Sequence, residues 1–330
     1  MNTVVTGATG HLGNVLVREL LSRGESVRAI IPPFEDTTSL EGLEVEKVEG
    51  DVLNVDSLIP AFKKADVVYH LAGIISPSPR KTKVQYQVNV IGTRNVLEAS
   101  LRSGVGRLVH VSSVEAIVTP PHGTVFDETG PFDPARVVGG YGKSKSQASL
   151  EVLSAVERGL DAVIVCPTGA IGPYDFKPSI AGQVFIDAAK KKLKGRFYIR
   201  GGAYDFVDVR DIAIGQILAC EKGRTGEAYI LSGERISQAD LASLVQEAAE
   251  INMRCFGMPQ WLFWIMANIA HIYYTLKDIP PTFTLDNLRI VTSNSFISHE
   301  KAHRELGYSP RPLRETIADT IKWFRESGRL

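Results

Sequence analysis

The feature that most constrains the fold is a glycine-rich turn near the start of the chain. Residues 4–13 have the sequence VVTGATGHLG, in which a β-branched run is followed by Gly7, Gly10 and Gly13 at Gly-x-x-Gly-x-x-Gly spacing. The first glycine allows a tight turn out of a strand, the second lets backbone N–H groups approach a pyrophosphate, and the third lets the following helix pack closely on the sheet. Between a strand and an amphipathic helix, this spacing predicts a dinucleotide-binding turn.

Short apolar strands alternate with helical stretches through the first two thirds of the chain. We expect strands at 3–6, 26–31, 45–49, 67–71, 108–112, 162–166 and 228–231, and helices at 12–22, 55–62, 83–100, 142–158 and 209–221. Strands and helices in this order form right-handed βαβ units. The sequence therefore predicts an α/β fold with a Rossmann-type doubly wound parallel sheet.

The alternation loosens after Pro167, where longer loops begin, and residues 238–330 are mostly helical and rich in turns. We expect a nucleotide-binding domain over 1–168, rejoined by about 204–232. A smaller C-terminal substrate lobe is expected to contain 169–203 and 233–330.

Charge and cysteine content exclude several classes of partner. The 330 residues include 37 basic and 37 acidic side chains, and this neutral balance argues against binding to nucleic acid. Cys166, Cys220 and Cys255 are odd in number and lack metal-ligand spacing, so we expect neither disulfides nor a bound metal. Met1 leads directly into the first predicted strand without a leader segment, which predicts a cytoplasmic protein.

One stretch, 261–276, has the strongly apolar sequence WLFWIMANIAHIYYTL. It is shorter than the roughly 20 residues of a membrane-spanning helix, and Asn268 and His271 interrupt it. We expect a buried helix or a lid over an apolar pocket. Membrane association is the alternative, and it requires an exposed aromatic face.

Polar and small residues stand at three predicted strand ends, where ligands bind in such sheets. Asp51 follows the third strand, where its carboxylate can accept the exocyclic amine of adenine. Ala72 and Gly73 end the fourth strand and leave room for a cofactor. Ser112 and Ser113 place hydroxyl groups at the tip of the fifth.

Tyr141 and Lys145 lie four residues apart at the start of a predicted helix, and therefore on one helical face. A tyrosine has a pKa of about 10, so as an acid or base it needs a positive charge that stabilises its phenolate. Lys145, together with an oxidised nicotinamide ring, would supply that charge. With Ser113 bound to the substrate oxygen, Tyr141 is the expected general acid or base.

Together these motifs resemble an extended short-chain dehydrogenase/reductase over essentially the whole chain. They occur in the family's order: TGATGHLG at 6–13, GDV at 50–52, HLAG at 70–73, NVIGTRNV at 89–96, SS at 112–113, YGKSK at 141–145, PTGAIGP at 167–173 and KAHRELGY at 301–308. The resemblance implies that Ser113, Tyr141 and Lys145 are catalytic and that Lys145 also holds the nicotinamide ribose. It gives Asn89 a partly structural role.

The resemblance also implies NAD or NADP as the cofactor. The residues expected to bind it are Gly7, Thr9, Gly10, His11, Leu12, Gly13, Asp51, Val52, Leu71, Ala72, Gly73, Asn89, Val111, Ser112, Tyr141, Lys145, Pro167, Thr168 and Gly169. At the end of the second strand an acidic residue selects NAD and an arginine selects NADP, but Pro32 stands there. Glu35 and Asp36 are candidate ribose ligands and Arg28 is a candidate phosphate ligand, so the choice stays open.

Two positions favour ketone reduction or alcohol oxidation, as in dihydroflavonol reductases and 3β-hydroxysteroid dehydrogenases. Tyr204 replaces an arginine that binds the sugar-nucleotide diphosphate in epimerase-like members, and Cys166 replaces an asparagine that contacts their substrate. A diphosphate needs charge-assisted partners. The residues expected to contact substrate are Ser113, Glu115, Tyr174, Phe176 and Tyr204, with packing an equal alternative for Tyr174 and Phe176.

Three other expectations follow. A nucleotide-sugar epimerase or dehydratase is the alternative activity, and a non-catalytic dinucleotide-sensing regulator is the second alternative. The retained Ser113, Tyr141 and Lys145 set argues against the regulator. Family members pair through two helices, here 83–100 and 142–158, so a homodimer acting on a small-molecule substrate is expected.

Overall fold

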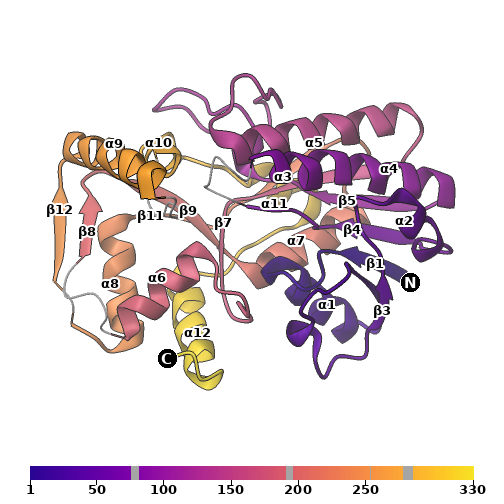
Figure 1. Ribbon diagram of the computed structural model, residues 1–330, viewed down its shortest axis with the longest axis horizontal. Coiled ribbons are helices and arrows are strands. Elements are labelled where there is room, and N and C mark those ends of the chain that lie inside the picture. Colours follow the sequence, from indigo (N-terminus) through magenta and orange to yellow (C-terminus); the bar gives the residue numbers. More distant parts are fainter. Residues whose placement is uncertain (76–81, 191–195, 253, 278–284) are drawn as a thin grey trace.

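A seven-stranded parallel sheet forms the larger part of the computed structural model, which describes all residues except 76–81, 191–195, 253 and 278–284 (Figure 1). Its strand order is β10-β6-β5-β4-β1-β2-β3. The strands are β1 (Asn2–Thr6), β2 (Ser26–Ile31), β3 (Glu46–Glu49), β4 (Val67–His70), β5 (Arg107–Val111), β6 (Ala162–Pro167) and β10 (Ala228–Leu231). The predicted doubly wound fold is confirmed. The strand order runs outward from β1 to β3 on one side, and β4 then begins the series on the other side of β1.

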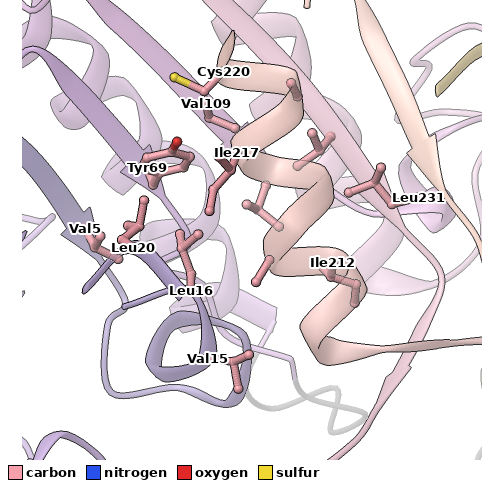
Figure 2. Close-up of a cluster of buried hydrophobic side chains, with 14 of the residues drawn as sticks. Val5, Val15, Leu16, Leu20, Tyr69, Val109, Ile212, Ile217, Cys220 and Leu231 are labelled. Atoms are coloured by element: carbon pink, nitrogen blue, oxygen red, sulfur yellow. The ribbon is translucent and has the colours of Figure 1, made fainter. Parts of the chain in front are cut away.

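Helices cover both faces of this sheet. On one face lie α1 (His11–Ser22), α7 (Val209–Lys222) and α11 (Glu300–Leu306), and on the other α2 (Val55–Ala61), α4 (Gly92–Ser103) and α5 (Gly139–Glu157). Figure 2 shows side chains of α1 and α7 meeting those of the strands in one buried cluster. The central strands are buried on both faces, which is why they appear in the sequence as nearly continuous apolar runs, whereas the edge strand β3 is largely exposed.

The expected helix 83–100 is divided in the structure. It consists of α3 (Thr82–Tyr86), a π-helical turn η3 (Gln87–Ile91) and α4. The predicted helix 142–158 begins three residues early, at Gly139, so Tyr141 lies inside the first turn of α5. Two short 3-10 turns, η1 (Thr38–Leu40) and η4 (Val114–Ala116), follow β2 and β5.

A second, smaller region contains two small sheets. One has the order β11-β9-β7, from β7 (Gly169–Ile171), β9 (Ala203–Asp208) and β11 (Glu234–Ser237), and packs with α6 (Ile180–Ala189), α8 (Gln238–Ala249) and α12 (Leu313–Glu326). The other joins β8 (Arg196–Ile199) to β12 (Cys255–Met258), beside α9 (Gln260–Lys277) and α10 (Leu285–Val291). We call these elements the small-sheet region, and the seven-stranded sheet with its helices the large-sheet region.

The apolar stretch 261–276 forms most of α9, but it is not a fully buried helix. Phe263 and Ala267 are buried, whereas Trp261, Ile265 and Ile269 are exposed. Within the described residues, no helix is both long enough and apolar enough to cross a membrane.

Candidate active site

The three glycines differ in what surrounds them. Gly7 has φ +72°, and a Cβ there would lie 2.6 Å from the backbone nitrogen of Ala72. A Cβ on Gly13 would lie 2.1 Å from the carbonyl oxygen of Gly7. A Cβ on Gly10 would meet no atom closer than that oxygen, at 3.4 Å, and Gly10 is exposed. The turn is therefore closed by backbone at Gly7 and Gly13 and open at Gly10.

The open side of this turn fits a phosphate group. Gly10 is the N-cap of α1, no side chain caps the helix there, and its first turn contains no acidic residue. The first N–H groups of a helix carry partial positive charge and lack intrahelical partners. Backbone N–H groups at the start of α1 are thus available to a pyrophosphate.

Glu35 is the acidic residue nearest to the glycine turn. Its Oε1 accepts a hydrogen bond of 3.1 Å from the Thr9 hydroxyl, and it also pairs with Lys177. Arg28 is engaged elsewhere, because its guanidinium pairs with Glu46 at 2.9 Å and donates to the Ala61 carbonyl. Arg28 therefore links strand β2 to strand β3 at the protein surface. Glu35 lies in the loop where a ribose would follow the pyrophosphate.

The other residues expected at the adenine end have partners of their own. Oδ1 of Asp51 accepts from the Leu53 N–H at 2.9 Å, and the Val52 carbonyl accepts from the Asn95 side chain. His11 donates through Nε2 to the Pro173 carbonyl at 2.9 Å. His11 thereby fastens the start of α1 to the loop after β7, while Leu12 packs against the core of the sheet.

Ser113, Tyr141 and Lys145 converge at the carboxyl end of β5. Ser113 and Tyr141 form a side-chain hydrogen bond, and Lys145 lies one turn further along α5. Burial and the nearby Glu115 carboxylate raise the pKa of the Tyr141 phenol, and the hydrogen bond from Ser113 acts in the opposite direction. These surroundings favour the neutral phenol, so ionisation of Tyr141 requires additional positive charge.

Lys145 is buried and points to the sheet. Its Nζ donates to the carbonyl of Val111 at 2.8 Å, and burial lowers the pKa of its ammonium group to about 8. A Cβ on Gly73 would lie 3.4 Å from this Nζ, so the small residues after β4 leave the space beside Lys145 open. The two ring nitrogens of His70 hydrogen-bond the hydroxyls of Thr6 and Thr93, and burial lowers the pKa of this imidazole to about 3.

Asn89 lies in the π-helical turn and holds two segments together. Its Oδ1 accepts from the Ile74 N–H at 2.8 Å, and its Nδ2 donates to the Ile74 carbonyl and to the Ser144 hydroxyl. The wider turn places this side chain between the segment that follows β4 and helix α5; such π turns are frequent at functional sites. These contacts agree with the structural role that the family resemblance implies.

Thr168 connects the large sheet to the small-sheet region. It follows Pro167, the last residue of β6, and precedes Gly169 in β7. Its hydroxyl donates to Oδ1 of the buried Asp205 at 2.6 Å, and the Gly233 N–H donates to the same oxygen at 2.9 Å. Burial raises the pKa of Asp205 to about 6. No local sequence pattern marks Asp205 as a site residue, because its partners come from distant segments.

A cavity of about 50 Å³ lies beside the serine motif. Two expected substrate residues, Glu115 and Tyr204, line it, next to Val114, which follows Ser113. Burial and then the Glu115 charge raise the pKa of the Tyr204 phenol, and Tyr141 contributes to the same shift. The Glu115 charge thus raises the pKa of two phenols, that of Tyr204 at the cavity and that of Tyr141 near the serine motif.

Other residues that line the cavity were not expected from the sequence. Phe126 and Val138 belong to the long segment between η4 and α5, and Arg289 and Ile290 belong to α10. Asn294 joins the two segments, because its Nδ2 donates to the carbonyls of Pro121 and Thr124. No local pattern marks these residues, since contacts across more than 150 positions bring them together.

Tyr174 and Phe176 do not line this cavity. Phe176 lies 5.3 Å from the Trp323 ring, and the Arg18 guanidinium lies 4.5 Å from the Tyr174 ring centre. Both aromatic side chains therefore join α1 to α12. These contacts match the packing alternative for the pair.

Comparison with known proteins gives matches over nearly the whole chain. The model of the NAD dependent epimerase/dehydratase family matches residues 3–232. Sterol demethylase protein B of Methylococcus capsulatus is 34% identical over 339 residues, and the match covers 99% of each chain. The 4-hydroxy-2-methyl-3-oxo-4-farnesyl-3,4-dihydroquinoline-1-oxide ketoreductase of Stigmatella aurantiaca is 30% identical, covering 99% of this chain and 98% of that protein. The crystal structure of gox2253 superposes with a TM-score of 0.87 at 35% identity, covering 99% of both chains.

Proposed function

The chain belongs to the NAD-dependent epimerase/dehydratase family, and from this premise we propose that it interconverts a ketone and a secondary alcohol on an apolar small molecule. The resemblance to extended short-chain dehydrogenases/reductases is thereby confirmed, and the protein is an NAD-dependent enzyme of that type. The observation that carries the proposal is the convergence of Ser113, Tyr141 and Lys145 beside a cavity that Tyr204 lines.

NAD fits the residues that would hold it. The open face at Gly10 and the uncapped start of α1 would take the pyrophosphate, and Glu35, held at the glycine turn by Thr9, would accept a ribose hydroxyl. Asp51, Gly73 and the segment from Pro167 to Gly169 would complete the site. When bound, the nicotinamide supplies the hydride acceptor or donor.

The roles we propose for the three catalytic residues rest on their side-chain chemistry and on the family resemblance. Ser113 hydrogen-bonds the substrate oxygen, and Tyr141 transfers the proton to or from that oxygen. Lys145 stabilises the Tyr141 phenolate with its positive charge. The raised pKa of Tyr141 makes this charge necessary, because burial alone would keep the phenol protonated.

The lining of the cavity supports an apolar substrate. Val114, Phe126, Val138 and Ile290 contribute apolar side chains, and Tyr204 stands where epimerase-like relatives carry a diphosphate-binding arginine. The named activities of two relatives, on a sterol and on a farnesylated quinoline, point in the same direction.

Titration distinguishes the substrate classes directly. The NAD-loaded protein is mixed with hydroxysteroid or flavonoid-like ketones and alcohols, and separately with UDP-sugars, and NADH absorbance and heat of binding are followed. We expect turnover with a member of the first group. Micromolar affinity for a UDP-sugar together with no response to any ketone or alcohol would contradict the proposal.

A nucleotide-sugar epimerase or dehydratase is the second candidate, and Arg289 is the observation in its favour. This arginine lines the cavity, and its guanidinium would form charge-assisted hydrogen bonds with a substrate anion. Arg289→Gln should then raise the dissociation constant for a UDP-sugar by about tenfold or more, which is the range of a charge-assisted hydrogen bond. The same variant should bind an uncharged ketone as the parent does.

Assembly, location and the division of the chain complete the proposal. We propose a cytoplasmic homodimer that pairs through the helices at 83–100 and 142–158, which the ion pair of Arg94 with Glu151 at 2.6 Å joins within one protomer. Light scattering that gives only monomer at micromolar concentration would contradict the dimer.

We further propose that residues 1–168 with about 204–232 bind the cofactor and that 169–203 with 233–330 hold the substrate. At this junction β9 (Ala203–Asp208) pairs with β7 and β11 in a small sheet.

A further inference from the structure

The described part of α9 exposes one continuous apolar face. Trp261, Ile265 and Ile269 recur at every fourth position with Met266 beside them, and between 42% and 63% of each is accessible to solvent. Residues four apart lie above one another on a helix, so these side chains form a stripe along α9. Membrane association of a helix that does not span the bilayer requires an exposed apolar face of this kind.

Two further aromatic side chains are exposed at the same end of the small-sheet region. Phe197 of β8 and Phe256 of β12 are opposite each other in the two-stranded sheet, and their ring centres are 5.9 Å apart. Figure 1 shows this sheet adjacent to α9, and β12 leads directly into the helix. We call Phe197, Phe256, Trp261, Ile265, Met266 and Ile269 the apolar patch. A clustered apolar surface of this kind marks a site of interaction.

Basic residues predominate in the segments that contain the apolar patch. Residues 187–204 and 250–278 carry three acidic residues, Asp187, Glu250 and Asp278, and eight lysine or arginine residues. Of these, Lys190, Arg200 and Arg254 are exposed in the structure. The Arg200 N–H donates to the Met258 carbonyl at 3.0 Å, which fixes this arginine beside the residues that precede α9. Apolar and aromatic side chains bordered by basic ones match a bilayer with anionic headgroups.

We propose that the apolar patch docks on the surface of a lipid bilayer that contains anionic headgroups. The helix α9 lies in the interface, with its exposed stripe among the acyl chains and its basic neighbours at the headgroups. This mode of attachment requires no membrane-spanning helix, and none occurs among the described residues.

The buried face of α9 connects this surface to the cavity. Phe263 and Ala267 pack in one cluster with Leu288 of α10, and the next two residues of α10, Arg289 and Ile290, line the cavity. Docking would therefore bring the cavity wall close to the bilayer. The transfer of an apolar substrate from lipid to the cavity rests on the proposed function, whereas docking itself does not.

Vesicle sedimentation tests the docking without any substrate. The purified protein is spun with vesicles of phosphatidylcholine alone and of phosphatidylcholine mixed with phosphatidylglycerol. We expect binding to the mixed vesicles, and about tenfold or greater loss of that binding in Ile265→Ser/Ile269→Ser. The matched control is Ile75→Ser/Val84→Ser, which removes two aliphatic residues of similar exposure (68% and 52%) from the large-sheet region and should bind as the parent does.

Charge reversal tests the headgroup contact separately. Arg200→Glu/Arg254→Glu should remove the preference for mixed over pure phosphatidylcholine vesicles, while Lys322→Glu on α12 should leave it unchanged. Circular dichroism and NAD affinity verify that each variant is folded.

Three results would overturn the proposal: no binding of the parent to mixed vesicles, equal binding by the patch variant and its control, or a dimer that Ile265→Ser/Ile269→Ser dissociates. The last result would assign the face to a second copy of the chain. Failure of ketone turnover would refute the proposed function and leave the vesicle result unaffected.

Discussion

The large-sheet and small-sheet regions use their side chains differently. In the large-sheet region the central strands are buried on both faces and most candidate functional groups stand at strand ends, so position along the chain almost fixes position in the site. In the small-sheet region the elements are short, and the residues that line the cavity come from distant segments. The difference teaches that the binding of a common cofactor can be encoded locally, whereas the shape of a substrate site depends on how separate segments pack.

Substitution of Gly10 tests whether the large-sheet region binds the cofactor at the glycine turn. Gly10→Leu should remove measurable NAD binding in calorimetry while the protein keeps its fold, because a side chain at Gly10 would fill the open phosphate space. Gly13→Ala is the contrasting variant: its Cβ would lie 2.1 Å from the Gly7 carbonyl oxygen, so it should lower thermal stability. Unchanged NAD affinity in folded Gly10→Leu would refute the assignment of the turn.

The catalytic set lies where the two regions meet, and Tyr141→Phe tests it. This change removes only the ionisable hydroxyl, so kcat should fall by about a hundredfold or more with NAD affinity nearly unchanged. The exposed Tyr86 provides the control, and Tyr86→Phe should keep the parent kcat. A Tyr141→Phe enzyme that keeps its kcat would show that another group transfers the proton.

Asp205 hydrogen-bonds Thr168 and Gly233 where the two regions meet, and its ionisation should make the stability of the folded protein depend on pH. Its pKa is raised from 3.8 to about 6, so the folded protein holds this proton more tightly than the unfolded chain does. The resulting stabilisation is complete below about pH 4 and is lost as the pH rises through 6.

Asp205→Asn removes this dependence while keeping an oxygen that can accept from Thr168 and Gly233. Between pH 4 and pH 7 its free energy of unfolding should therefore gain on the parent by up to about 3 kcal/mol, or roughly 1.4 kcal/mol per unit of pKa shift. Urea unfolding of both proteins at several pH values measures the difference. Parallel pH curves for the two proteins would show that Asp205 does not ionise in this range.

Two substitutions with small expected effects, at Phe176 and at Glu115, test which residues belong to the substrate site. Phe176 packs on Trp323 between the two regions, so Phe176→Leu should lower the free energy of unfolding by about 1 kcal/mol and leave kcat/KM unchanged. Glu115→Gln, at the cavity wall, should do the reverse by changing kcat/KM with little loss of stability. A large fall of kcat/KM in Phe176→Leu would restore Phe176 to the substrate site.

Local patterns in the sequence were enough to predict the strands of the large sheet and the glycine turn, because most of these strands are apolar runs and the turn depends on glycine geometry; helical periodicity likewise placed Tyr141 and Lys145 on one face of α5. These patterns did not determine the five short strands of the small-sheet region, which are three to six residues long and gain their stability from partners far along the chain.

The tertiary structure determines which aromatic residues line the cavity and which pack against other helices. Tyr204 and Tyr174 are both substrate residues by the sequence prediction. Tyr204 lines the cavity with Glu115, whereas Tyr174 lies under the Arg18 guanidinium. The tertiary structure likewise decided that α9 buries Phe263 and exposes Trp261, because a helix that is apolar on most sides has no sequence signal for the face that its neighbours will cover.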